Sequence, residues 1–417
     1  MRTVRIAVAD YSGHPFQVQL SRQLAARGHT VLHLHFSEFL TPKGRLDRDA
    51  DDPKTFISEA ISLGRPFSKY SFIHRRHQEI EVGSRFVARI QQFEPDVVIS
   101  SNMPLDAIRQ IVRAKRKHRY NLVFWQQDIY SIAITRILMQ KFGVIGRLVG
   151  AYYRAIEKRA LRESDAIVAI SSDFLTPLKE EFKQPLSKVH VIENWAPLNE
   201  ITPRPKVNAW SLANGLADKE VVLYTGTLGM KHNPELILSV AEAARHHRPD
   251  AVVVVTSEGE VADSLGSQAA SRSLTNLQIL PFQPYGVYPD VLGSADVLIS
   301  ILEPDAGIYS VPSKVLSYLC AGRAIVLSAP SENLAFSILE KAQAGLPTAA
   351  GNPTHFVDAV VALLSDPDLR SRSASNGRKY AETHFDIDQI TTKFERILAT
   401  VSLTQTADRV LEVAALK

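Results

Sequence analysis

Short apolar runs alternate with longer amphipathic segments along the whole chain. Each apolar run has the length of a buried strand, and apolar residues at helical spacing fill the segments between the runs. In the first half, the predicted strands are 5–9, 30–35, 95–100, 121–125, 165–171 and 189–192, and the predicted helices are 16–26, 79–92, 104–117, 132–162 and 173–183. Strand, helix and strand in succession form βαβ units, so the pattern predicts a parallel sheet.

A proline-containing stretch, residues 196–210, interrupts this alternation and is the best candidate for an interdomain linker. The βα pattern then begins again, with predicted strands at 221–224, 251–255, 277–280 and 295–300 and predicted closing helices at 354–364 and 378–400. We therefore expect an α/β protein with two Rossmann-like domains, 1–197 and 198–380, that face each other across a cleft. Residues 381–417 are expected to form a helical segment that crosses back to the N-terminal domain.

One segment fits the alternation poorly. Residues 40–76 are polar and irregular, with an acidic cluster at 47–52. We expect a long excursion containing a helix near 54–63, which is either functional or simply disordered.

Residues 303–328 read as a loop, a helix, a glycine stop and a strand. Ser310 is a candidate cap, and Pro312 is tolerated in a first helical turn. The free N–H groups of that turn, the Ser313 hydroxyl and the Lys314 ammonium would then point to one spot, which is how many folds bind a phosphate. An ordinary capped helix explains the same residues equally well.

Composition adds limits to this picture. Hydrophobic content of 45% and charged content of 22% are typical of a globular protein, and a single cysteine, Cys320, excludes an intramolecular disulfide. The N-terminus has no long apolar core of a signal peptide, and no apolar window is long enough to span a membrane, so we expect a cytoplasmic protein.

The net charge of +4 is unevenly distributed. Residues 1–200 have 30 Lys and Arg against 21 Asp and Glu, a balance of +9, whereas residues 201–417 have 18 against 23, a balance of −5. A basic front half indicates an anionic partner, although solvated helix faces are the commoner explanation. The densest basic run includes Arg113 and Arg116, and the 132–162 helix combines basic and aromatic residues in a way that suits an acidic membrane surface or packing on the sheet.

Several polar residues follow the predicted strands of the front half. Gly13 and His14 come after the first strand, and Gln127 and Asp128 come after the strand at 121–125. Open α/β sheets bind ligands at this edge, although each of these residues can equally be a turn cap. The turn after the first strand, Ser12-Gly13-His14, does not have the Gly-x-Gly-x-x-Gly pattern, so a nicotinamide dinucleotide site is poorly supported.

A set of motifs supports a resemblance to a known family. They are Arg27-Gly-His-Thr-Val, Pro95-Asp-Val-Val, Trp125-Gln-Gln-Asp-Ile-Tyr, Asp165-Ala-Ile-Val-Ala-Ile-Ser, Val191-Ile-Glu-Asn-Trp-Ala, Tyr224-Thr-Gly-Thr-Leu-Gly-Met-Lys, Ser294-Ala-Asp-Val-Leu-Ile, and Pro312-Ser-Lys through Ala321-Gly-Arg. In this order the chain resembles the retaining GT-B glycosyltransferases of family 4, in particular bacterial members that build surface polysaccharides. The resemblance covers nearly the whole length.

The resemblance implies that the back domain binds a nucleotide-sugar donor, most simply a UDP-sugar, and that the front domain binds the acceptor. Lys231 matches the family lysine that contacts the donor diphosphate, whereas the usual arginine before it is replaced by Thr227. The paired glutamates of the family would fall near Tyr309 and Ser317 and are absent, so Lys314 of the Pro-Ser-Lys variant would supply charge to the leaving diphosphate. The donor site would comprise Gly13, Gly226, Thr227, Glu258, Gly259, Phe282, Glu303, Ser310 and Ser313.

The remaining roles follow from the chemistry of sugar transfer. Cations and backbone N–H groups stabilise a leaving diphosphate, so Lys231 and Lys314 are candidate catalytic residues together with Asp128 and His14. Gln127, Arg113 and Arg116 are candidates for acceptor binding. No Asp-x-Asp motif follows a predicted strand, so we expect no metal and no cofactor beyond the donor.

Three functions remain open from the sequence. The first is a transferase that moves a sugar, of the N-acetylated hexosamine type, from UDP to a lipid-linked or oligosaccharide acceptor at the inner face of the membrane, with no role for nucleic acid. The second is a nucleotide-sugar isomerase of the 2-epimerase type that uses His14 and Asp128. The third is a catalytically inactive scaffold, which the missing glutamates would explain.

Overall fold

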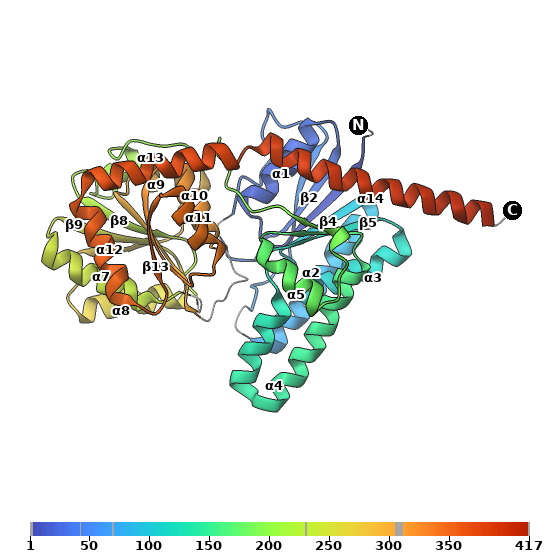
Figure 1. Ribbon diagram of the computed structural model, residues 1–417, viewed down its shortest axis with the longest axis horizontal. Coiled ribbons are helices and arrows are strands. Elements are labelled where there is room, and N and C mark those ends of the chain that lie inside the picture. The colour runs from blue at the N-terminus through green and yellow to red at the C-terminus, as the bar shows by residue number, and fades with distance from the viewer. Residues whose placement is uncertain (1–2, 42, 69–70, 230–231, 305–311, 416–417) are drawn as a thin grey trace. The chain divides into compact units, whose positions relative to one another are not determined.

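A computed structural model describes residues 3–41, 43–68, 71–229, 232–304 and 312–415, with side chains to residue 402. The chain divides into two units, Met1–Glu193 together with Ile387–Lys417, and Asn194–Asp386 (Figure 1). The units divide after Glu193 and after Asp386, whereas the predicted boundaries were 197/198 and 380/381.

The first unit has a parallel sheet with helices on both faces, as the βα alternation predicts. The strand order is β3-β2-β1-β4-β5-β6-β7. Its elements are β1 (Arg5–Asp10), α1 (Pro15–Ala26), β2 (Thr30–Phe36), β3 (Phe56–Ile61), α2 (Phe72–Phe93), β4 (Val97–Ser101), α3 (Leu105–His118), β5 (Asn121–Gln126), α4 (Tyr130–Glu163), β6 (Ala166–Ala169), α5 (Leu175–Glu180) and β7 (Val189–Val191).

The expected helix near 54–63 is wrong, because residues Phe56–Ile61 form the edge strand β3. Phe56 is fully buried, and the strand pairs in parallel with β2 from Val31 to Phe36. Two isoleucines in six residues favour an extended backbone, and the ladder to β2 satisfies one row of its polar groups. The segment before it therefore returns to the sheet.

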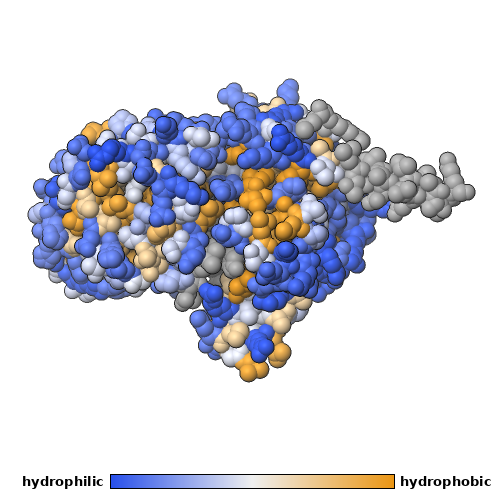
Figure 2. Space-filling view, viewed as in Figure 1, coloured by the Kyte–Doolittle hydropathy of each residue, from blue (hydrophilic) through white to orange (hydrophobic). Residues whose placement is uncertain are grey.

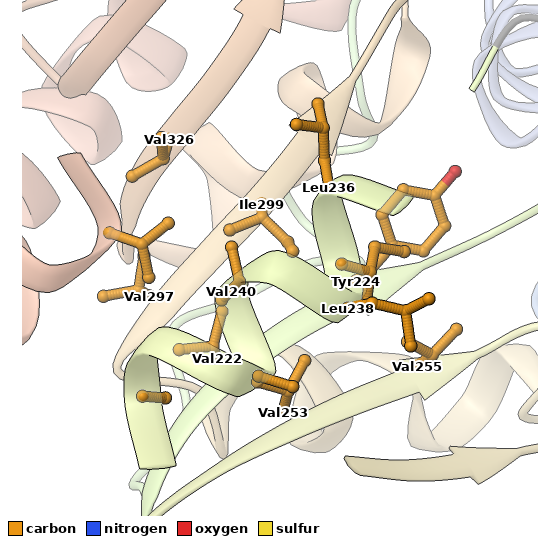
Figure 3. Packing of buried hydrophobic residues seen from close by; sticks show 14 of the residues in the cluster. Val222, Tyr224, Leu236, Leu238, Val240, Val253, Val255, Val297, Ile299 and Val326 are labelled. Atoms are coloured by element: carbon orange, nitrogen blue, oxygen red, sulfur yellow. The ribbon is translucent and has the colours of Figure 1, made fainter. Parts of the chain in front are cut away.

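The second unit repeats the same order, β10-β9-β8-β11-β12-β13, in a second parallel sheet. Its elements are α6 (Ala209–Ala213), β8 (Glu220–Thr225), α7 (Pro234–His247), β9 (Ala251–Thr256), α8 (Glu260–Ser271), β10 (Leu277–Leu280), α9 (Tyr288–Gly293), β11 (Val297–Ile301), α10 (Ser313–Ala321), β12 (Ala324–Ala329), α11 (Leu334–Ala342), β13 (Gly345–Ala349), α12 (Pro353–Ser365) and α13 (Pro367–His384). Valines of β8, β9 and β11 pack against Leu236 and Val240 of α7 in its core (Figure 3).

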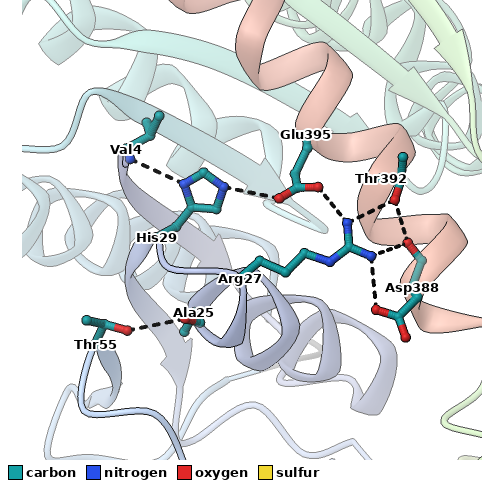
Figure 4. A network of polar contacts seen from close by, with 8 residues as sticks. All are labelled: Val4, Ala25, Arg27, His29, Thr55, Asp388, Thr392 and Glu395. Carbon is teal, nitrogen blue, oxygen red and sulfur yellow. Dashed lines mark hydrogen bonds and ion pairs between the residues drawn. The ribbon is translucent and has the colours of Figure 1, made fainter. Parts of the chain in front are cut away.

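The last helix, α14 (Ile387–Ala415), belongs to the first unit. The Arg27 guanidinium binds Glu395 at 2.6 Å and Asp388 at 2.9 Å, and His29 lies between Val4 and Glu395 (Figure 4). Phe394 packs edge-on against Trp125, with ring centroids 4.9 Å apart. Polar contacts with Arg27 and His29 and an aromatic contact with Trp125 therefore attach the C-terminal helix to the first unit.

Candidate functional site

In each sheet the strand order reverses beside the first strand of the unit, between β1 and β4 and between β8 and β11. Loops that leave the carboxyl ends of two such strands go to opposite faces, which opens a crevice at that edge. We therefore expect the candidate residues of each unit at this edge of its sheet.

In the second unit, Gly226 directly follows β8 and has a φ of +107°, which an L side chain rarely adopts. Its N–H donates to the Thr256 carbonyl at 3.0 Å, which ties the turn to the end of β9. A Cβ built on Gly226 would lie 3.7 Å from Lys314 Nζ, so the turn after β8 and the first turn of α10 are in contact. The structure thus brings together Gly226, Thr227 and Lys314.

Helix α10 begins at Ser313, and Pro312 is its N-cap residue rather than a first-turn residue, so that detail of the prediction is wrong. The ring of Pro312 fixes φ but offers no side-chain acceptor, and no described side chain caps this end. Ser310, the predicted cap, lies outside the described residues. The predicted stop is confirmed, since Gly322 adopts the left-handed conformation with φ 60°.

The Lys314 side chain of the second unit ends in a buried amine that lies against an aromatic ring. Its Nζ lies 3.6 Å from the centroid of the Tyr224 ring and is buried, with no hydrogen-bond partner among the described residues. Burial lowers the pKa of Lys314 well below its usual value because water no longer stabilises the charge. A ring face returns only part of that stabilisation, so an anion bound here would restore the charged form.

Two tyrosines hold the turn against this lysine, and the sequence analysis missed both. The Tyr224 hydroxyl donates to the Thr227 carbonyl at 3.0 Å. The Tyr318 hydroxyl accepts from Thr225 N at 3.2 Å and donates to the Ile299 carbonyl at 3.3 Å, which links β8, β11 and α10. Tyr318 lies four residues after Lys314, and this spacing on one helix face was the available signal.

The other predicted donor residues form a second cluster after β9 and β10. Gly259 has φ +102° and is the N-cap residue of α8, and the exposed Glu258 accepts from Phe282 N at 3.0 Å. Ser257, which was not predicted, accepts from Leu228 N at 3.2 Å and so connects this cluster to the turn after β8. Glu303 is half-buried after β11, Ser313 is exposed, and Lys231 lies outside the described residues.

The carboxyl edge of the first unit contains a buried acid that the sequence analysis did not single out. Asp10 ends β1, is fully buried and accepts from Ser12 N at 2.9 Å. Burial raises the pKa of Asp10 to about 7, although the N–H groups of residues 12–14 and the charge of Lys43 oppose this shift. Asp10 therefore shapes the turn that contains Gly13 and His14.

A second missed residue, Asn102, links the two candidate turns. It follows β4 with φ +53°; its side-chain amide donates to Ser12 Oγ, and its Oδ1 accepts from the Tyr130 hydroxyl at 2.6 Å. Ser12 adjoins Gly13 and His14, and Tyr130 closely follows Gln127 and Asp128. The predicted residues of the front edge are thus held by one polar network.

His14 and its neighbours have well-defined surroundings. The His14 ring is half-buried and stacks on Phe16 with centroids 5.7 Å apart. Gln127 is buried and Asp128 is half-buried. His14 follows β1, and Gln127 and Asp128 follow β5, so all three lie at the predicted strand ends.

Arg113 and Arg116 do not join this edge, because α3 carries them back toward the amino ends of the strands. Arg116 binds Glu163 at 2.6 Å. Arg113 lines a cavity of about 210 Å³ between α3 and α4, together with Arg109, Tyr152 and Arg159. These two arginines therefore lie away from the His14 turn.

Two structural findings concern metals and membranes. Among the described residues, no group of three or more His, Cys, Asp or Glu side chains could hold a metal ion. No helix in the described part of the chain is both long enough and apolar enough to cross a bilayer.

Comparison with protein families places both units. Residues 16–200 match the model described as Glycosyltransferase Family 4, and residues 209–380 match that of Glycosyl transferases group 1. WcaI of Escherichia coli, named as a glycosyl transferase of colanic acid biosynthesis, is 24% identical over 60% of this chain and 60% of its own. The alpha-D-kanosaminyltransferase of Streptomyces kanamyceticus is 24% identical over 53% of this chain and 56% of its own. The alignments therefore span less than two thirds of these curated relatives.

Solved structures share the fold over a greater length. Anabaena HepE in complex with UDP and glucose aligns with a TM-score of 0.69 at 16% identity, over 95% of this chain and all of that one. Sucrose-phosphate synthase of Thermosynechococcus elongatus aligns with a TM-score of 0.74 at 14% identity, over 97% of this chain and all of that one. At these identities the likeness shows the two-domain fold alone.

Proposed function

Because this chain belongs to the family 4 glycosyltransferases with the GT-B fold, we propose that it is a retaining enzyme that transfers a sugar from a UDP-sugar. The acceptor is a lipid-linked saccharide or an oligosaccharide, and the product enters a cell-surface polysaccharide. The transferred sugar is of the N-acetylated hexosamine class, and the enzyme works in the cytoplasm at the inner face of the membrane. HepE, solved with UDP and with UDP-glucose, supports UDP as the carrier.

The buried Lys314 ammonium group is the observation that carries the proposal. It lies over the Tyr224 ring, beside the Gly226 turn and at the start of α10, without a described hydrogen-bond partner. A diphosphate placed there would accept hydrogen bonds from the ammonium and from the first N–H groups of α10, where the helix dipole also favours negative charge. These residues form the diphosphate site of the proposal.

The chemistry follows from where charge develops. When the bond between the sugar and the diphosphate breaks, its electron pair goes to the phosphate oxygen, and the anomeric carbon becomes positive. Lys314 becomes fully charged on contact with the diphosphate and stabilises the leaving group, with Lys231 as the second proposed cation. Because these groups supply positive charge, the step needs no metal ion.

The acceptor side is proposed to be the carboxyl edge of the first unit. The network of Ser12, Asn102 and Tyr130 holds the turns of His14 and Asp128 in fixed positions. His14 and Asp128 are proposed to position the attacking hydroxyl and to receive its proton, and Gln127 to bind acceptor hydroxyl groups.

The experiment is a UDP-release assay with a panel of UDP-sugars, each with and without lipid-diphosphate and oligosaccharide acceptors. We expect release that requires an acceptor and is greatest with an N-acetylhexosamine donor, and Lys314→Ala should remove most of it. Conversion of the UDP-sugar without acceptor would instead indicate an isomerase. Absence of both reactions and of any thermal shift with UDP would indicate a scaffold.

A further inference from the structure

Helix α4 is a hairpin of two helical arms rather than one continuous helix. At Gly143 the backbone leaves the helical region with φ 53° and ψ −123°, so the chain reverses there. Gly150 and Gly146 allow the arms to approach closely: a Cβ on Gly150 would lie 2.5 Å from Thr135 Oγ1, and one on Gly146 would lie 2.0 Å from the Leu138 carbonyl oxygen. The hairpin projects away from the sheet of the first unit (Figure 1).

Exposed apolar side chains gather at the end of this hairpin. Val144 is 77% exposed, and Ile145 and Leu148 are each 69% exposed. The larger set of exposed apolar residues on α4 also includes Ile137, Met139, Phe142, Val149 and Tyr152. Figure 2 shows the apolar surface at the tip of the projection. A patch of this kind on a protruding element marks an interaction site.

The charge around the tip is of one sign. From Tyr130 to Ile156 the chain contains Arg136, Lys141, Arg147 and Arg154 and no acidic residue. Such a surface repels a second copy of itself and complements an anionic bilayer, in which basic side chains reach the headgroups and apolar ones reach the acyl boundary.

Behind the tip, the cavity of about 210 Å³ between α3 and α4 adds a place for a phosphate. Arg109, Arg113 and Arg159 line it. The Tyr152 hydroxyl, which also belongs to the lining, accepts from Arg109 at 2.7 Å and so fixes one of these guanidinium groups. Arginine clusters of this type bind phosphate groups through paired N–H donors.

We propose that the α4 hairpin inserts its tip, residues 142–148, into an anionic lipid bilayer, and that the arginines of the cavity bind a lipid phosphate. The tip enters the headgroup and acyl boundary and does not span the membrane, in line with the absence of a spanning helix among the described ones. The inference deepens the membrane-bound acceptor of the proposed function by naming the element and the lipid charge, yet its test needs no turnover.

The test measures co-sedimentation of the full chain with vesicles of phosphatidylcholine alone and of phosphatidylcholine mixed with phosphatidylglycerol. We expect binding to the mixed vesicles only, and roughly a tenfold or greater loss in the variant Val144→Ser, Ile145→Ser, Leu148→Ser. Leu212→Ser is the matched control, because Leu212 is 62% exposed on the second unit. Arg113→Gln with Arg159→Gln should weaken binding to the mixed vesicles while leaving UDP binding unchanged.

A depth measurement makes the test sharper. The three native tryptophans are at most 8% exposed, so Val144→Trp adds the one indole expected to reach lipid. Vesicles with brominated acyl chains should quench this added fluorescence but not that of Leu212→Trp. Unquenched Val144→Trp, equal vesicle binding by the serine variant, or a dimer in solution that the serine variant abolishes would each overturn the proposal. If the serine variant loses vesicle binding but keeps normal UDP binding and normal transfer to a soluble acceptor, the result supports insertion. If the wild-type chain binds vesicles but transfers no sugar, only the proposed function is contradicted.

Discussion

The variant Lys314→Met separates the stability cost of the buried amine from its proposed role in binding. A buried polar group without a partner costs about 1–3 kcal/mol. Because burial favours the neutral amine, the contact of Nζ with the Tyr224 ring, 3.6 Å from its centroid, returns less than a desolvated ammonium would, about 0.5–1 kcal/mol. Methionine keeps the apolar length and removes the polar end, so the unliganded variant should gain about 1 kcal/mol, or about 2–4 °C in the melting temperature of the second unit.

UDP should reverse the order. At a UDP concentration of about 100 times Kd, the wild-type protein gains about 2.7 kcal/mol. Loss of one charged hydrogen bond of about 2 kcal/mol weakens binding roughly 30-fold, so the variant gains only about 0.9 kcal/mol under the same conditions. The variant should therefore melt above the wild type without UDP and below it with UDP.

The assay is differential scanning calorimetry with and without UDP, with Lys341→Met, an exposed lysine of α11, as the control that should shift neither melting temperature. The pH dependence provides an independent check. The pKa of Lys314 in the folded protein lies well below 10.5, its value in the unfolded chain. Between these two pKa values folding releases a proton, so the free energy of unfolding of the wild type should rise with pH there, whereas that of the variant should not. A variant that melts below the wild type without UDP, or that keeps the full UDP shift, would refute this reasoning.

Three further predictions concern the first unit. Burial raises the pKa of Asp10 and of Glu157 to about 7, so the folded protein holds these protons more tightly than the unfolded chain does. As the pH rises from about 5 to 8, each acid must ionise in its buried site, and the free energy of unfolding should fall by on the order of 3 kcal/mol for each acid. Asp10→Asn should reduce this dependence of stability on pH, as measured by calorimetry. Arg27→Ala should cost about 1–3 kcal/mol and increase hydrogen exchange across 387–402, because it removes the ion pairs to Asp388 and Glu395. Arg116→Ala removes an exposed ion pair and should leave both stability and exchange nearly unchanged; equal protection in the two variants would contradict the attachment of α14. Asn102→Ala should lower turnover and stability, because it removes the hydrogen bonds to Ser12 and Tyr130 and places an alanine at φ +53°. Asn102→Gly removes the same bonds but relieves the backbone strain, so it should be more stable than the alanine variant. A glycine variant no more stable than the alanine variant would contradict this explanation.

Much of the fold could be predicted from the sequence because its strands are buried on both faces. Continuous apolar runs such as 221–224 and 251–255 have few alternatives to a central parallel strand, and Gly322 ends its helix by a strong local preference. The edge strand β3 was missed because an edge has a weaker apolar pattern and takes its stability from the ladder to β2.

The candidate site was predictable in part for a related reason. Lys314 and the Gly226 turn follow strands that were correctly placed, so the edge of the sheet on which they lie could be inferred. Tyr318, Asp10 and Asn102 act through contacts between residues far apart in the chain, such as Tyr318 with Thr225, and no local pattern contains that information.

The most direct measurement is a crystal structure of the full chain with bound UDP. We expect a phosphate oxygen about 2.7–3.2 Å from Lys314 Nζ, with the other oxygens facing the first N–H groups of α10. A diphosphate bound elsewhere, with the Lys314 amine against the Tyr224 ring and out of hydrogen-bond distance of every phosphate oxygen, would contradict the proposed diphosphate site.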